Sequence, residues 1–211
     1  MKKECLCFIL AFTCAMSIKA QVIKENFDSN SLDWNETASE SNAGKSVIDK
    51  GVLTITSFGI NKFWSAMVGS RVGKYTEFTC FCYAPLNVKR PFKINTNVTI
   101  GKLDDDKFVG LLFNYKDDGN FYAFIFNDED VKFLRKEDGE WVGSITQSVK
   151  WSKKRKAQQN WRLESDGSIL SFFVDELPIM KVRYMTLEYA GFGYLTFGNQ
   201  KLIVDDVEFR Q

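Results

Sequence analysis

Apolar and polar residues alternate along most of the sequence beyond residue 21, and this period of two restricts the fold more than any other feature. The segment 92–100 shows it clearly, because Phe, Ile, Thr, Val and Ile occupy every second position. Such alternation places one side of a strand on a buried face and the other toward solvent. We find no convincing amphipathic-helix pattern, so the sequence predicts an all-β protein.

Turn sequences separate the alternating segments. Asp117-Asp118-Gly119-Asn120, Glu137-Asp138-Gly139-Glu140 and Asp166-Gly167 are typical of hairpins, since Asp-Gly tolerates the positive φ that these turns need. The expected strands are 51–56, 75–83, 92–100, 109–115, 121–126, 131–135, 141–145, a strand around 161–163, 169–174, 179–184, 191–197 and 201–209. Many short strands joined by turns predict an antiparallel two-sheet sandwich, or jelly roll. Within 109–115 we expect one inward row of Val109, Leu111, Phe113 and Tyr115.

Residues 1–20 have the pattern of a signal peptide. Lys2 and Lys3 precede an apolar run from Cys5 to Met16, which is too short to span a bilayer, and Ala20 offers a small residue for cleavage. An acylated Cys14 is the alternative, although Phe12 and Thr13 make a poor lipobox. We therefore expect a single β-sandwich domain at 21–211 that is exported to the periplasm, the cell surface or the medium, and no transmembrane segment.

Charge and residue usage exclude several classes of function. Cleavage would remove three of the 28 basic and one of the 27 acidic residues, which leaves a nearly neutral chain and argues against a nucleic-acid binder. The chain has no histidine, which excludes Ser-His-Asp triads, Cys-His dyads and histidine-ligated metals. Cys80 and Cys82 share one face of a predicted strand, and we expect two small core residues rather than a disulfide.

Gly110-Leu111-Leu112-Phe113-Asn114-Tyr115 and the hairpin that follows it, Asp117 to Phe124, resemble the central hairpin of the concanavalin A-like lectin/glucanase superfamily. The order of Asn26-Phe27-Asp28, Asn160-Trp161-Arg162-Leu163 and Asp205-Asp206-Val207-Glu208-Phe209 around it fits the same superfamily. The resemblance covers nearly all of residues 22–211. It implies a jelly roll, in a superfamily that contains lectins, carbohydrate-binding modules, laminin G-like domains and glycosidases.

Aromatic side chains with polar neighbours suggest a saccharide site, because a ring can stack on a sugar while amides and charged groups bind its hydroxyls. We expect Trp34 and Trp161 to be core residues. Asn114 should lie opposite the inward row of its strand. The candidates for carbohydrate binding are Trp64, Asn114, Tyr122, Arg135, Trp141 and Trp151. A second candidate is the basic loop Lys153, Lys154, Arg155 and Lys156, which could hold an anionic ligand.

Acidic residues offer two further hypotheses. The superfamily's laminarinase-type members carry a Glu-x-Asp-x-x-Glu pattern that this sequence lacks, and we expect the charges of 137–140 to face water. A structural calcium is compatible with the oxygen ligands of Asp104, Asp105 and Asp106, of Asp117, Asp118 and Asn120, or of Asp205 and Asp206.

These observations favour an exported, non-catalytic module that binds a polysaccharide or oligosaccharide. The alternatives are a structural or protein-interaction sandwich of the bacterial cell envelope and a glycoside hydrolase whose carboxylates come from distant segments.

The amino terminus of the exported protein follows from the position of the apolar run. Because the apolar run ends before Ala20, we expect the exported protein to begin at Gln21, which intact-mass measurement checks. Retention of residues 1–20, or a lipid on Cys14, would contradict it.

Overall fold

The computed structural model describes residues 21–37, 43–58, 77–103, 107–149, 151, 157–183 and 187–211. This part of the chain forms fourteen strands and no helix, so the all-β prediction is confirmed. Accordingly, the described residues contain no helix of the length and apolarity needed to cross a bilayer.

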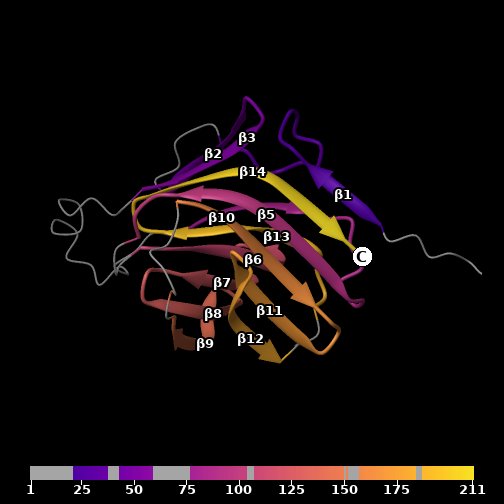
Figure 1. Cartoon of the computed structure of the whole chain (residues 1–211), viewed down its shortest axis with the longest axis vertical. Coiled ribbons are helices and arrows are strands. Elements are labelled where there is room, and N and C mark those ends of the chain that lie inside the picture. The colour runs from indigo at the N-terminus through magenta and orange to yellow at the C-terminus, as the bar shows by residue number, and fades with distance from the viewer. Residues whose placement is uncertain are drawn as a thin grey trace, which may run out of the picture.

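Two antiparallel sheets pack face to face (Figure 1). The larger sheet contains, in order, β12 (Leu177–Arg183), β11 (Ile169–Val174), β10 (Gln158–Ser165), β5 (Phe92–Ile100), β14 (Gln200–Arg210), β3 (Val52–Ser57) and β2 (Gly44–Asp49), and β1 (Val22–Glu25) also pairs with β14. The smaller sheet contains β4 (Glu77–Tyr83), β13 (Gly191–Phe197), β6 (Phe108–Asp117), β7 (Asn120–Phe126), β8 (Asp130–Glu137) and β9 (Glu140–Ser148). The predicted two-sheet sandwich is confirmed.

Aromatic rings from both sheets fill the space between them. The expected core residues Trp161 and Trp34 are 0% and 2% exposed. Trp161 meets Phe126 edge to face with centroids 5.3 Å apart, and Trp34 stacks on Tyr194 at 5.7 Å. Cys80 and Cys82 face the same core as free thiols, and burial raises the pKa of Cys80 to about 12.

Several buried polar groups are paired within the chain, whereas the Nε1 of Trp34 and the Nε2 of Gln159 have no hydrogen-bond partner among the described residues. The hydroxyls of Thr96 on β5 and Tyr194 on β13 lie 2.7 Å apart and join the two sheets. The buried Glu25 carboxylate accepts hydrogen bonds from the backbone N–H groups of Phe27 (3.0 Å) and Leu32 (3.1 Å). Since a buried carboxylate is costly without donors, these bonds fix the segment that delivers Trp34 to the core.

The smaller sheet also has an apolar cluster on the face that points away from the larger sheet. We call it the outer cluster; its members are Phe108, Leu112, Tyr115, Phe121, Ala123, Ile125 and Leu195, with Phe81, Leu134 and Phe197 packed against it. Its central members Leu112, Ala123 and Leu195 are fully buried. The smaller sheet is therefore buried on both faces at its centre, which a simple inside–outside alternation does not predict.

Gly110 permits the close approach of strands beneath the outer cluster. A Cβ atom on this residue would lie 1.8 Å from the carbonyl oxygen of Phe124 on β7. Backbone cannot yield as the end of a side chain can, so any larger residue would push β6 and β7 apart.

Overpacking typically costs ~1–3 kcal/mol, and we expect Gly110→Ala to destabilise the fold by ~3 kcal/mol or more. In a chain of this size, such a loss lowers Tm by at least ~5 °C. Gly143→Ala is the matched control, because a Cβ there meets no atom within 4 Å. Thermal unfolding of dilute protein measures both, and equal Tm values for the two variants would contradict the close approach.

Candidate functional site

A β-bulge at Asn114 interrupts the central strand β6. The residue has a φ of 51°, a left-handed conformation that Asn tolerates better than most residues. Phe113 pairs with Phe192 on β13, whereas the next pair is Tyr115 with Gly191, so Asn114 is the extra residue. The bulge places Phe113 in the core between the sheets and Tyr115 in the outer cluster. The prediction of one inward row through Tyr115 is therefore wrong, because the extra residue reverses the alternation.

Beyond the bulge, the tip of the β6–β7 hairpin folds over the outer face of the smaller sheet. The Tyr115 ring packs on Phe81 of β4 with centroids 3.9 Å apart. Thr79 of β4 donates a hydrogen bond of 3.1 Å to Asp118 in the hairpin turn. The hydroxyl of Tyr83 donates to the backbone oxygen of Lys116 at 3.0 Å.

The tip of the β8–β9 hairpin folds over the same face. The Trp141 ring lies 6.2 Å from that of Phe197, and Lys136 on β8 forms an ion pair with Glu77 on β4. In a flat sheet, four strand spacings of about 4.8 Å would put β8 and β4 some 19 Å apart. The smaller sheet is therefore strongly curled, and its hairpin tips cover the outer cluster.

The bulge at Asn114 leaves a polar cleft of about 240 Å³, where the β6–β7 and β8–β9 hairpins meet the segment before β13. Its walls are Asn114, Lys116, Asn120, Phe121, Tyr122, Lys136, Glu137, Glu188 and Tyr189. The Asn114 Oδ1 accepts hydrogen bonds from the backbone N–H groups of Glu188 (2.8 Å) and Tyr189 (3.0 Å), which fixes the far wall. Its Nδ2 donates to none of the described residues and remains available to a ligand.

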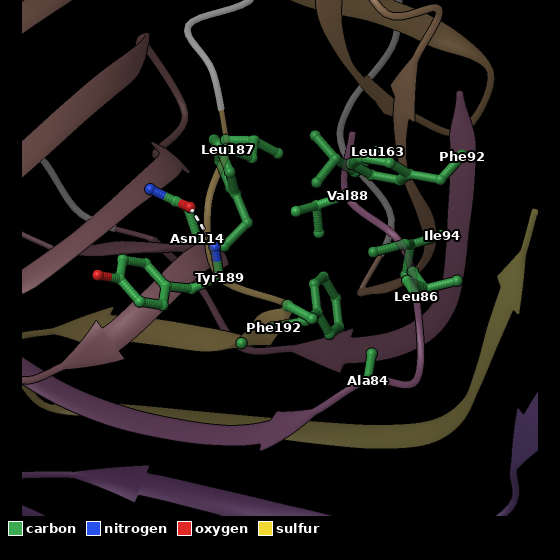
Figure 2. Close-up of a pocket in the computed structure, with 13 residues that line it drawn as sticks. Ala84, Leu86, Val88, Phe92, Ile94, Asn114, Leu163, Leu187, Tyr189 and Phe192 are labelled. Atoms are coloured by element: carbon green, nitrogen blue, oxygen red, sulfur yellow. Dashed lines mark hydrogen bonds between the residues drawn. The ribbon is translucent and has the colours of Figure 1, made fainter. Parts of the chain in front are cut away.

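Figure 2 shows what lies behind this wall. Leu187, Leu163 and Phe192 line an apolar pocket, while the Asn114 amide and the Tyr189 ring point away from it. The pocket has a volume of about 10 Å³, which is at most the space of one water molecule. It is a packing defect of the core, whereas the polar cleft is large enough to hold a ligand.

Charged groups hold the aromatic walls of the cleft. Arg135 lies 5.7 Å from the centre of the Tyr122 ring and forms an ion pair with Glu137. The hydrogen bond to Glu137 raises the pKa of Arg135. The Lys116 ammonium lies 5.9 Å from the Tyr189 ring. The cleft thus presents rings beside hydrogen-bonding groups of both charges.

The structure brings together only some of the residues that the sequence suggested. Asn114 and Tyr122 line the cleft, and Arg135 supports it. Trp141 is 43% exposed but packs on Phe121 behind the cleft. Trp151 is remote from the cleft: its Nε1 donates to the backbone oxygen of Asp128 at 3.0 Å and its ring packs on the buried Phe126. Trp64 and the basic loop Lys153, Lys154, Arg155 and Lys156 lie outside the described residues.

Sequence reasoning missed several cleft residues. Glu137, expected to face water, is half-buried beside Arg135. Glu188 and Tyr189 carry no motif, and only the fold brings them to Asn114. Tyr83 was also missed; its ring is 57% exposed and is held beside the cleft by the hydrogen bond to Lys116.

Several of the candidate calcium ligands are engaged by other described residues. Asp118 accepts from Thr79 and Tyr115, and both oxygens of Asp206 accept from Asn97. Among the described residues, no three Asp, Glu, Cys or His side chains converge on a metal-sized space. Asp104, Asp105 and Asp106 fall outside that part of the chain.

Comparison with solved structures identifies the fold. The chain is similar to the laminarinase catalytic domain of Thermotoga maritima, with 12% identity and a TM-score of 0.60 over 91% of this chain and 98% of that one. It is also similar to the endo-β-1,3-glucanase of Pyrococcus furiosus, with 12% identity and a TM-score of 0.59 over 91% and 94%. The chain has the concanavalin A-like jelly-roll fold. No family model and no curated protein sequence matches it.

Within this concanavalin A-like fold, the Asn114 bulge is the feature that shapes the cleft. Asn114→Gly keeps the left-handed backbone but removes the acceptor for Glu188 and Tyr189. We expect faster hydrogen exchange at these two amides in Asn114→Gly. Asn114→Ala should show the same loss and be ~1–2 kcal/mol less stable than Asn114→Gly, since a Cβ is unfavourable at positive φ.

Hydrogen exchange and denaturant unfolding of the two variants measure these effects. Unchanged exchange at both amides, or an alanine variant as stable as the glycine variant, would contradict this description of the bulge.

Proposed function

We propose that this chain is an exported, non-catalytic carbohydrate-binding protein, and that a saccharide binds in the cleft between Tyr122 and Tyr189. The observation that carries the proposal is the convergence of two tyrosines, two asparagine amides and charged side chains on one cleft. Rings can stack on the apolar face of a sugar, and buried or half-buried polar groups select its hydroxyls. The signal-peptide pattern of residues 1–20 supports export.

The size of the cleft favours a short ligand. Its volume of about 240 Å³ lies just below the ~300–1,000 Å³ typical of small-molecule pockets. A terminal sugar or one or two residues of a longer chain would fill it. The exposed Tyr83 ring beside Lys116 offers a neighbouring surface for the next sugar.

The carboxylates of the cleft are Glu137, which is ion-paired with Arg135, and Glu188; the centre of the smaller sheet adds none. Glycoside hydrolysis needs two carboxylates about 5–10 Å apart around the scissile bond. Two central cross-strand rows on the outer face of the smaller sheet contain no acidic residue. Their members, all within the described part of the chain, are Gly193, Leu112, Ala123 and Leu134 in one row and Leu195, Gly110, Ile125 and Lys132 in the other. The glucanase neighbours are under 25% identical, so their activities are not carried over to this chain.

The test is a glycan array probed with residues 21–211, followed by titration of the best ligand. We expect Tyr189→Ala to weaken binding at least about tenfold, a loss of ~1.4 kcal/mol, with little change in Tm because the ring is half-buried. Phe173→Ala is the matched control. This half-buried ring lies on the larger sheet under Arg162, with the guanidinium carbon 4.0 Å from the ring centre. It should leave binding unchanged.

Two outcomes would contradict the proposal. Binding that survives Tyr189→Ala, or no binding to any glycan, would favour the protein-interaction sandwich. Release of reducing sugar by the purified protein, abolished by Glu188→Gln or Glu137→Gln, would make the cleft a hydrolase site.

A further inference from the structure

Strand β9 forms an edge of the smaller sheet that is open to solvent (Figure 1). All nine of its residues are exposed, including Trp141 (43%), Val142 (48%) and Ile145 (53%). Glu140 is its only charged residue, and it has no proline. A long edge strand with a single charge and exposed apolar side chains is a template for pairing with another strand.

The other sheet edges in the described part of the chain are protected. β12 carries Pro178, Lys181 and Arg183. At β4, Asn35 binds both backbone groups of Phe81. The Asn35 backbone N–H donates to the Phe81 oxygen at 3.0 Å, and the Phe81 N–H donates to the Asn35 Oδ1 at 2.5 Å. β2 is covered by the bridge between Thr37 and Ser46, and β1 has four residues. These are the usual devices against edge-to-edge association, and β9 lacks them.

The larger sheet does not extend over β9. Its edge strand β12 lies against β8, and Ile145 pairs with Phe133 of β8 on the side of the sheet that faces the core. Phe133 is buried, whereas Ile145 is half exposed because no strand of the larger sheet covers it. A large apolar side chain on a core-facing row thus lies open beyond the edge of the sandwich.

The middle of β9 is complementary to itself. An antiparallel copy related by a two-fold axis at Ser144 would place Ile145 of one copy opposite Gly143 of the other, on the same face. A Cβ on Gly143 would meet no atom within 4 Å, so the space for the partner's isoleucine is open. No charges of like sign would face each other, because Glu140 would lie opposite Ser148.

We propose that two copies of this chain associate by antiparallel pairing of their β9 strands across Ser144, so that the two smaller sheets become one continuous sheet. The pair is isologous, and each copy contributes the same surface. One strand pair is a small interface, so the dimer is weak and depends on protein concentration. This inference does not rest on the saccharide cleft.

Sedimentation velocity from about 1 to 300 μM tests the association, a range that covers weak complexes. We expect a monomer–dimer equilibrium in the native chain. Ile145→Lys should raise the protein concentration at which half of the chains are dimeric at least about tenfold. In that variant a charged lysine from each copy would lie opposite Gly143 of the other copy, where the native pair has an apolar isoleucine. Ile169→Lys, another exposed isoleucine (42%) on β11, is the matched control and should dimerise normally.

Cysteine substitution tests the register. Opposed Cα atoms in an antiparallel pair lie about 4.5–5.5 Å apart, within disulfide range. Ser144→Cys should form a disulfide-linked dimer on mild oxidation, whereas Ser148→Cys, about 27 Å from its copy in this register, should not. A monomer at all concentrations, an Ile145→Lys variant that dimerises like the native chain, or equal crosslinking of the two cysteine variants would overturn the proposal.

Discussion

The contact between Tyr115 and Phe81 brings β6 against β4 across the intervening strand β13, and the shape of the smaller sheet depends on it. Asn114 makes this contact possible, because one extra residue in the left-handed conformation turns Tyr115 to the outer face. The hairpin tips then close over the outer cluster. Burial of these side chains contributes roughly 1.5–3 kcal/mol for each large apolar residue, which offsets the unfavourable backbone at Asn114.

The same bulge moves the place where a ligand can bind. Apart from Lys132, apolar residues and glycines occupy the central rows of the outer face, and Leu112, Ala123 and Leu195 are fully buried there. Polar groups lie instead beside the bulge, where the Asn114 Oδ1 accepts hydrogen bonds from the backbone of Glu188 and Tyr189. A strained backbone position that also organises a polar cleft is typical of functional sites, and this is why we propose the cleft as the saccharide site.

Much of the fold could be predicted from the sequence because most strands follow a simple alternation. The expected strand 92–100 is β5, and the Asp117–Asn120 and Glu137–Glu140 turns join hairpins as predicted. β2 was missed because Gly44 and Ser46 occupy buried positions without an apolar side chain. β1 has four residues, too few for a pattern.

The candidate site was less predictable than the fold. The sequence identified Asn114 and Tyr122 from their place in the central hairpin. It assigned Tyr115 to the wrong face, because an alternating pattern gives no sign of an extra residue in one strand. Trp151 lies in a predicted loop, which suggested an exposed ring, but the ring packs on the buried Phe126. An indole can cover the core in this way because its N–H still reaches a backbone oxygen, here that of Asp128. Glu188 and Tyr189 reach the cleft only through tertiary folding, which no local pattern encodes.

The smaller sheet curls until its hairpin tips cover its own outer face. Nuclear Overhauser effects between ring protons test it most directly, because they report separations under about 5 Å and need no variant. We predict cross-peaks between Tyr115 and Phe81 and between Trp141 and Phe197, whose ring centres lie 3.9 and 6.2 Å apart. In a flat sheet the strands of the second pair would be some 19 Å apart. Observing the β8–β9 strand contacts without either of these ring contacts would contradict the account.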